Sequence, residues 1–253
     1  FFFNSHNNFF EEIAKFRAAR KIWANIMKEK FNVTNKKGLM CRFHTQTAGS
    51  TLQAQQIDNN IIRTTMQATA AILGGTQSLH TNSKDEALAL PTEQSAQTAL
   101  RTQQILAYET GLPDVTDPLA GSHYIESLTK EIENKTLLLI DQVDKMGGAI
   151  SAIEKNFQQN KIADSAFEYQ KSIDNNEQII VGVNKFTNSA IQENNSILEI
   201  NQKSIDSQLK RLTQFKKTRL SDNVKNSLDL LSTSIKDDKN LIPHIINCIK
   251  NSC

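Results

Sequence analysis

Polar side chains recur on one face of a short predicted strand. The stretch "LMCRFHTQT" begins as an apolar, β-prone run and places Arg42, His44 and Gln46 at every second position. Successive side chains in a strand point to opposite faces, so the guanidinium, imidazole and amide should lie together. A packed barrel core would hold aliphatic residues there, and an unpaired buried guanidinium is very costly. The face therefore either lines a ligand cavity or is the solvent-facing side of an edge strand.

In the cavity interpretation, these side chains have clear chemical uses. Arg42 matches an anionic or carbonyl group of a ligand. His44 is able to donate a hydrogen bond or to shuttle a proton. A second stretch, "GGTQSLHTNSKDEAL", has the same ingredients, with Gln77 and Ser78 on opposite faces of a predicted strand and more polar residues directly after it.

Asn82 and Glu86 follow that strand and are four residues apart. If a helix begins near Ser83, as we predict, both lie on one face of its first turn. Their carbonyl and carboxylate groups would suit two hydroxyls of a ribose. Alternatively, Asn82 or Ser83 is an N-cap, and Glu86 or Asp85 offsets the helix dipole. The local sequence leaves both interpretations open.

The elements that position these residues are predicted strands that alternate with helices. The run "FFFNSH" predicts a strand, and the helix after it has Ile13 and Phe16 at helical spacing, with Asn8 as its expected N-cap facing Glu11. A helix at about 59–72 follows the second strand. Another helix, through "PTEQSAQTALRTQQILAYETG", follows the third. This alternation predicts βα units, a parallel sheet and the α/β fold class.

A change in composition predicts further parts of the chain. The stretch "GLPDVTDPLAGS" is rich in turn residues, so we divide the chain there into 1–110, 111–186 and 187–253. The middle part should be helical, with a C-cap at Gly147 and one short strand in "EQIIVGVNKF". "TNSAIQENNS" reads as an exposed loop. The last part should be helical, with an apolar stripe suited to a partner; its residues are Leu209, Leu212, Leu228, Leu231, Ile242 and Ile246.

Composition excludes several classes of function. The net charge of +2 is too small to indicate nucleic-acid binding. The longest apolar runs fall far short of the ~20 residues of a membrane helix. Cys41, Cys248 and Cys253 have no zinc or disulfide spacing, so we expect no metal site and a reducing, cytoplasmic location. The chain opens without Met on residues typical of the middle of a fold, so we expect its start to be missing.

Several long segments of the chain resemble one enzyme family. They include both stretches above, "FFFNSHNNFFEEIAKFRAARKIWA", "AQQIDNNIIR", "TNSKDEALALPTE", "DPLAGSHYIESLT" and "VGVNKF". Together they are similar to the adenosylcobalamin-dependent acyl-CoA mutases, above all to the large, substrate-binding part of methylmalonyl-CoA mutases. The similarity is dense up to about Phe186 and thin after it.

The resemblance implies a fold and an activity. The three predicted strands would be the last three βα units of a (β/α)8 TIM barrel around a coenzyme A thioester, which makes 1–110 a partial barrel domain followed by a mainly helical extension. The activity would be a radical 1,2-rearrangement such as the interconversion of methylmalonyl-CoA and succinyl-CoA. The cofactor would be adenosylcobalamin, held by a cobalamin-binding domain or small subunit. Another mutase chain is a further expected partner.

The resemblance also implies roles for the residues. Arg42 would contact the coenzyme A portion, His44 the reacting thioester and Gln46 the cobalamin side of the pocket. Gln77 and Ser78 would lie near the pantetheine or substrate. Two further roles complete the set: Asn82 and Glu86 would hold the adenosyl ribose, and Phe3 would help to wall the cavity.

The sequence departs from the family in two ways. The five earlier barrel strands and the Asp-x-His-x-x-Gly loop that supplies the lower cobalt ligand have no counterpart in it, so we expect no catalysis from this chain alone. In addition, Gln53, Ile57, Lys84 and His123 stand where the family usually has Thr, Pro, an apolar residue and Tyr. The alternatives are a non-catalytic CoA-binding or mutase-docking module and a generic α/β fragment without a ligand.

Overall fold

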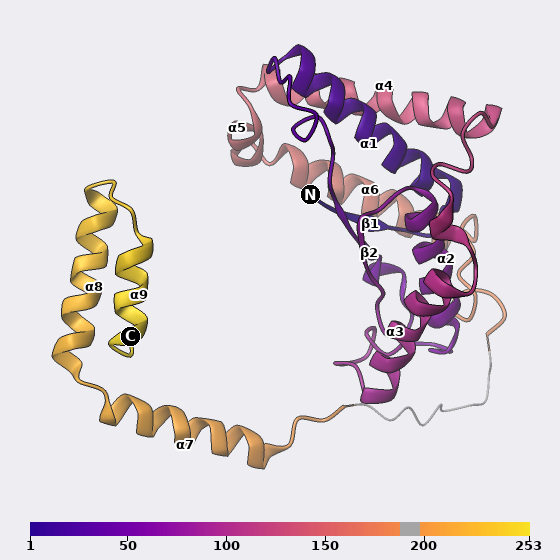
Figure 1. The fold of residues 1–253 in the computed structure, drawn as a ribbon. Coiled ribbons are helices and arrows are strands. Elements are labelled where there is room, and N and C mark those ends of the chain that lie inside the picture. The colour runs from indigo at the N-terminus through magenta and orange to yellow at the C-terminus, as the bar shows by residue number, and fades with distance from the viewer. Residues whose placement is uncertain (188–197) are drawn as a thin grey trace. The chain divides into compact units, whose positions relative to one another are not determined.

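The structure, a computed structural model, describes residues 1–187 and 198–253 (Figure 1). Contacts within the chain divide it into two units, Phe1–Leu198 and Glu199–Cys253. The exposed loop predicted at 187–196 lies, apart from its first residue, outside the described residues.

A parallel sheet and the helices around it form the first part of the chain. The strands lie in the order β1-β2-β3, and His44 is in register with Phe2 on one side and Ser78 on the other. The predicted α/β class and the alternation of three strands with helices are therefore confirmed. The elements are β1 (Phe2–Ser5), α1 (Phe9–Glu29), β2 (His44–Thr47), η1 (Gly49–Thr51), α2 (Asn59–Leu73), β3 (Ser78–His80) and α3 (Glu93–Tyr108).

An aromatic core fixes the buried face of the sheet. Phe43, just before β2, stacks on Phe16 of α1 with ring centroids 5.2 Å apart, and both side chains are buried. Phe3 and Leu79 pack against the same cluster from β1 and β3. The buried positions Ile13 and Phe16 confirm the predicted apolar face of the first helix. Side chains that alternate with these core positions must point away from the helices.

The start of α1 differs from the prediction in one detail. Asn8 is the N-cap residue, but its side chain makes no bond to a helix amide. Its Nδ2 instead donates to Oε2 of Glu11 at 2.5 Å. The Asn8 side chain is thus oriented toward the Glu11 carboxylate, and its Oδ1 makes no bond to a backbone amide of the helix. Asn8 therefore occupies the predicted N-cap position without making the predicted capping bond.

The prediction that a helix begins near Ser83 is wrong, because residues 84–88 form a turn. Asp85 is buried, and its Oδ2 accepts hydrogen bonds from the Thr92 amide at 2.9 Å and the Thr92 hydroxyl at 3.2 Å. Thr92 in turn caps α3 by accepting from the Ser95 amide. Pro91 also disfavours helical backbone in the residue before it. The carboxylate thus anchors the next helix instead of starting one.

The short strand predicted in "EQIIVGVNKF" is also wrong. The structure has only an isolated bridge between Val181 and Lys185, with a turn between them. The Asn184 side chain accepts from the Ile180 amide and donates to the Gln178 carbonyl, both at 2.8 Å. Such local side-chain bonds satisfy backbone groups that a strand would use in a ladder.

Helices make up the rest of the described chain. Gly147 follows α4 with a φ of 98°, in the left-handed region, as expected for a residue just beyond a helix end. No helix among the described residues has the length and apolar character needed to cross a membrane. The remaining elements are η2 (Leu112–Asp114), α4 (His123–Lys145), α5 (Ala149–Glu154), α6 (Phe157–Asp174), α7 (Gln202–Thr218), α8 (Ser221–Lys236) and α9 (Ile242–Lys250).

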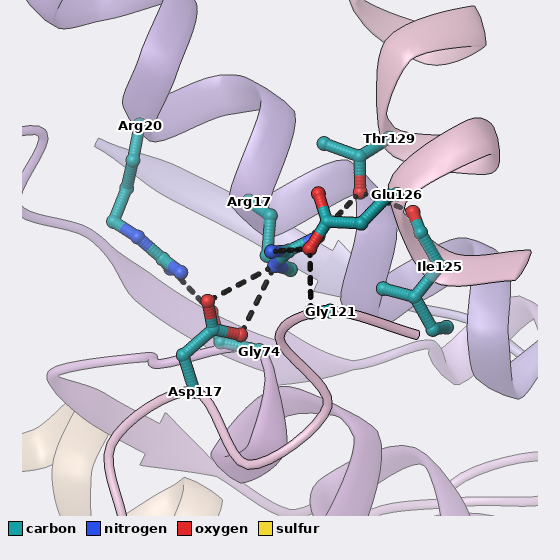
Figure 2. A network of polar contacts seen from close by, with 8 residues as sticks. All are labelled: Arg17, Arg20, Gly74, Asp117, Gly121, Ile125, Glu126 and Thr129. Atoms are coloured by element: carbon teal, nitrogen blue, oxygen red, sulfur yellow. Dashed lines mark hydrogen bonds and ion pairs between the residues drawn. The ribbon is translucent and has the colours of Figure 1, made fainter. Parts of the chain in front are cut away.

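An arginine connects α4 and the loop before it to α1 (Figure 2). Nε of Arg17 donates to both carboxylate oxygens of Asp117, at 3.0 and 3.2 Å, and Nη2 donates to Glu126 at 2.7 Å. Its Nη1 donates to the Thr129 hydroxyl at 3.0 Å. The Glu126 bond is the main cause that raises the pKa of Arg17, and the same bond lowers the pKa of Glu126. Arg17 therefore holds both α4 and the loop before it on α1.

Arg17 should contribute more to stability than an exposed ion pair between the same helices. We expect Arg17→Met to lower the melting temperature by several degrees, because the change leaves Asp117 and Glu126 without their shared partner. Lys30→Met is the matched control, since Lys30 and Asp144 are about half exposed and such pairs contribute little. Thermal unfolding followed by circular dichroism measures both. Equal shifts for the two variants would contradict this assignment.

Asp85 should make stability depend on pH. Burial disfavours its charged form, but hydrogen bonds from the Thr92 amide and from Ser95 and Ser83 outweigh burial, so the pKa of Asp85 is lowered. Because the pKa of Asp85 is lower in the folded than in the unfolded chain, its ionised carboxylate stabilises the fold above about pH 4. This stabilisation is lost as the pH falls through the pKa of the folded state. We expect Asp85→Asn to cost about 1–2 kcal/mol at pH 7. In urea titrations the variant and the native chain should converge at acid pH; a constant difference would refute the charge effect.

Candidate functional site

The polar face predicted on β2 exists and points away from the helices. Arg42 lies two residues before β2 and is exposed, His44 is half-buried, and Gln46 is exposed. Thr45 and Thr47 are buried on the opposite face. The period-2 alternation thus separates a helix-facing core from a polar surface, which we call the polar face: Asn4, Arg42, His44, Gln46, Ser78 and His80.

Hydrogen bonds connect the polar face across neighbouring strands. His44 Nδ1 lies 2.7 Å from the Ser78 hydroxyl. Gln46 Nε2 donates to Oδ1 of Asn82 at 3.0 Å. The first contact orients the imidazole from β3. The second brings the loop after β3 over the carboxyl end of β2, where α/β enzymes keep their functional groups.

Asn82 is bound firmly to the end of β2. The side chain is 2% exposed, its Nδ2 donates to the Thr47 carbonyl at 3.0 Å, and its backbone amide donates to the Thr47 hydroxyl at 2.9 Å. The amide group retains further hydrogen-bonding capacity, since it has two donor hydrogens and two acceptor lone pairs. Asn82 is therefore a rigid polar group at the rim of the sheet.

Glu86 and Gly49 complete the rim. A Cβ added to Gly49 would lie 3.1 Å from both Nδ2 of Asn82 and Oε1 of Glu86, so the missing side chain leaves room for these groups. Partial burial of the carboxyl group raises the pKa of Glu86, with a further rise from Asp85 and an opposing effect of His80. The residue as a whole is nevertheless exposed. The loop after β3, with its turn at 84–88, thus brings the Asn82 amide and the Glu86 carboxylate beside Gly49, although the predicted helix does not form.

Two of the predicted site residues lie elsewhere. Phe3 packs in the core, with its ring 5.1 Å from that of Phe43, on the opposite side of the sheet from His44. Gln77 lies on the same side as Leu79, and its Oε1 accepts from the Phe43 amide at 2.7 Å. Its amide is therefore engaged within the sheet, at the amino end of β3.

Sequence reasoning missed two residues at this site. Phe2 is in register with His44, is 84% exposed, and has its ring centroid 5.4 Å from the imidazole. The strand period separates Phe2 from Phe1 and Phe3, but it does not say which of these sets lies on the polar face. Gly49 gave no signal, since a single glycine after a strand is common.

Among the described residues, no group of three or more His, Cys, Asp or Glu side chains is arranged to hold a metal ion. The polar face and the rim together offer hydrogen-bonding groups, one guanidinium, two imidazoles and one carboxylate. Such a set suits an anionic ligand with carbonyl and hydroxyl groups.

A parallel α/β sheet with polar groups at the carboxyl ends of its strands is an enzyme-like arrangement, and sequence comparison specifies the family. A family model described as "Methylmalonyl-CoA mutase" matches residues 1–253. The chain belongs to the methylmalonyl-CoA mutase family. The match includes the final helices, so the family relationship extends beyond the segments up to Phe186.

Individual relatives agree with the family match. The chain is 43% identical over 251 residues to the 2-hydroxyisobutanoyl-CoA mutase large subunit of Aquincola tertiaricarbonis, covering 99% of this chain and 45% of the relative. It is 45% identical over 240 residues to the methylmalonyl-CoA mutase of Rhizobium meliloti (94% and 33%). For the mitochondrial methylmalonyl-CoA mutase of Bos taurus the identity is 40% over 255 residues (100% and 34%). The chain thus spans less than half the length of these relatives.

Gly49 should be needed for the arrangement of the rim. Its backbone does not require glycine, so Gly49→Ala should fold with near-native stability while the new methyl displaces Asn82 or Glu86 by a few tenths of an ångström. We expect shifted side-chain amide resonances of Asn82 and Gln46 in NMR spectra. Ser50→Ala, at the exposed neighbouring position, is the control. Unchanged amide resonances in Gly49→Ala would show that the rim is looser than described.

Proposed function

We propose that this chain is part of an adenosylcobalamin-dependent acyl-CoA mutase, an isomerase that catalyses a radical 1,2-rearrangement of a coenzyme A thioester. Interconversion of methylmalonyl-CoA and succinyl-CoA is the main candidate. The observation that carries the proposal is the pair of contacts His44–Ser78, at the start of β2 and β3, and Gln46–Asn82, at the carboxyl end of the sheet. The relatives named above include mutases for two different acyl groups, so the acyl group of this chain's substrate stays open.

The proposal includes an assembly larger than the sheet described here. Three parallel strands leave sheet edges with unpaired backbone groups, and a (β/α)8 barrel requires eight strands to close. We propose that the three βα units are the last three of such a barrel. This chain alone would then be inactive and would work with the rest of the barrel, a cobalamin-binding domain or subunit, and another mutase chain.

The polar face supplies the proposed contacts to the thioester. Arg42 would bind the anionic coenzyme A portion, because a guanidinium makes charge-assisted bonds to phosphate or carbonyl oxygens. The Ser78 contact holds Nδ1 of His44, which would leave Nε2 to donate to the thioester carbonyl. Ser78 would lie near the pantetheine or substrate, whereas Gln77, which bonds to the Phe43 amide within the sheet, would take no part in this contact. On this geometry, Phe2 takes the role of cavity wall that the resemblance gave to Phe3.

The rim residues fit the adenosyl group of the cofactor. The Glu86 carboxylate is an acceptor for ribose hydroxyls, the Asn82 amide has spare capacity beside it, and Gly49 leaves space between them. Gln46 would face the cobalamin from β2. When bound, adenosylcobalamin supplies the radical chemistry; the residues of this chain bind, orient and exclude water. The lower cobalt ligand would come from the cobalamin-binding domain or subunit.

A non-catalytic role is the second candidate. In the unit 199–253, the helix α7 buries no side chain, and Leu209, Leu212 and Phe215 are 42–55% exposed. An apolar stripe of this kind is suited to a partner surface. The chain would then be a CoA-binding or mutase-docking module without its own chemistry.

Calorimetry separates these proposals. We expect the chain to bind an acyl-CoA, and we expect Arg42→Ala to weaken binding about tenfold or more, since a charge-assisted hydrogen bond contributes ~1.5–3 kcal/mol. Arg211→Ala in α7 is the matched control and should bind like the native chain. Absence of acyl-CoA binding, together with co-purification with another mutase chain, would favour the docking role and refute a retained pocket.

A further inference from the structure

The face of α2 that packs under the sheet carries amides where a buried helix face is usually apolar. Asn60 and Gln67 are 0% and 1% exposed. They are seven residues apart, which is close to two helical turns, so they lie on the same face of the helix. Buried amides are costly unless they are hydrogen-bonded. Their partners therefore indicate why they are there.

Gln67 connects the ends of β1 and β2 from below. Its Oε1 accepts from the Ala48 amide at 2.9 Å, an amide that also donates to the Ser5 carbonyl. Its Nε2 donates to the Thr51 hydroxyl at 2.8 Å and to Oδ1 of Asn7 at 2.7 Å. The loop after β1 and the loop after β2 are thus bound to one side chain.

Asn60 makes the corresponding connection between β2 and β3. Its Oδ1 accepts from the Gln53 amide at 3.0 Å, and its Nδ2 donates to the Gln53 carbonyl at 2.8 Å and to the Lys84 carbonyl at 2.9 Å. Arg63 adds a bond to the same Oδ1 at 2.7 Å. Lys84 belongs to the turn that presents Glu86, so Asn60 fixes this turn relative to the loop that contains Gly49.

We infer that Asn60 and Gln67 are positioning residues of the candidate site. They contact no group of the polar face. Instead, they hold the loops after all three strands at fixed distances, and so set the spacing between Gln46, Asn82 and Glu86. Only the identity of the ligand rests on the proposed function; the geometric role does not.

The two amides should respond in opposite ways to isosteric acids. A carboxylate at position 60 loses the donor to the carbonyls of Gln53 and Lys84, which have no hydrogen to offer in return. A carboxylate at position 67 keeps an acceptor for the Ala48 amide, and the Asn7 amide is able to rotate and donate to it; the Thr51 hydroxyl already donates to the Ala48 carbonyl at 2.7 Å and keeps that bond. Asn60→Asp should therefore loosen the rim, and Gln67→Glu should preserve it.

Hydrogen–deuterium exchange of the full chain measures loop positioning directly. We expect Asn60→Asp to speed exchange about tenfold in peptides covering 84–89. This factor corresponds to the loss of about one to two net hydrogen bonds. Gln67→Met should do the same in peptides covering 48–53, whereas Gln67→Glu should stay close to the native rate. Thr64→Val is the matched control: it lies between the two amides, is buried, and its hydroxyl has no partner among the described residues.

The outcomes decide the inference. Local acceleration in Asn60→Asp and Gln67→Met, with native rates in Gln67→Glu and Thr64→Val, supports it. Native rates in all variants, or equal acceleration in Gln67→Met and Gln67→Glu, overturn it. If Asn60→Asp also accelerates exchange throughout α1, the chain is unfolding, and Asn60→Ser replaces it under the same criteria. Acyl-CoA calorimetry on the native chain tests the proposed function separately, because the exchange rates are measured on the chain without a ligand.

Discussion

The stacking of Phe43 on Phe16 is the contact on which the rest of the sheet depends. It fixes which face of β2 lies against the helices, and the strand period then sends Arg42, His44 and Gln46 to the other face. The parallel register carries the same division to β1 and β3, so Phe2 and Ser78 lie beside His44. A change of one residue in register would exchange the core with the polar face.

Much of this arrangement was predictable from the sequence, because it follows from periodicity. The alternation in "LMCRFHTQT" separates polar from buried side chains, and the helical spacing of Ile13 and Phe16 gives the covering helix. The side of the sheet on which Phe3 lies was not predictable, since three consecutive phenylalanines fit either parity. The core contact with Phe43 decides it.

The parts that sequence reasoning missed depend on side-chain bonds between distant residues. Residues 82–90 have good local signals for a helix start, but Asp85 bonds to Thr92 and fixes a turn. Asn60 and Gln67 lie on a buried helix face whose other residues are small, namely Thr64 and three alanines. Their polarity predicts that they lie on the surface. Both are buried instead, because their amides make hydrogen bonds to backbone groups of the loops that α2 packs against. A motif search therefore finds the residues that face the ligand more easily than those that support them.

The attachment of α4 to α1 has a different physical character from the aromatic core. Besides Arg17, it includes the ion pairs Lys21–Glu133 and Lys30–Asp144, and each of these pairs has at least one partly exposed partner. Dissolved ions screen such charges over about 8–10 Å at physiological ionic strength, but they do not weaken the stacking of buried rings. The ionic part of the attachment of α4 is therefore sensitive to salt in a way that the packing of the sheet on its covering helices is not.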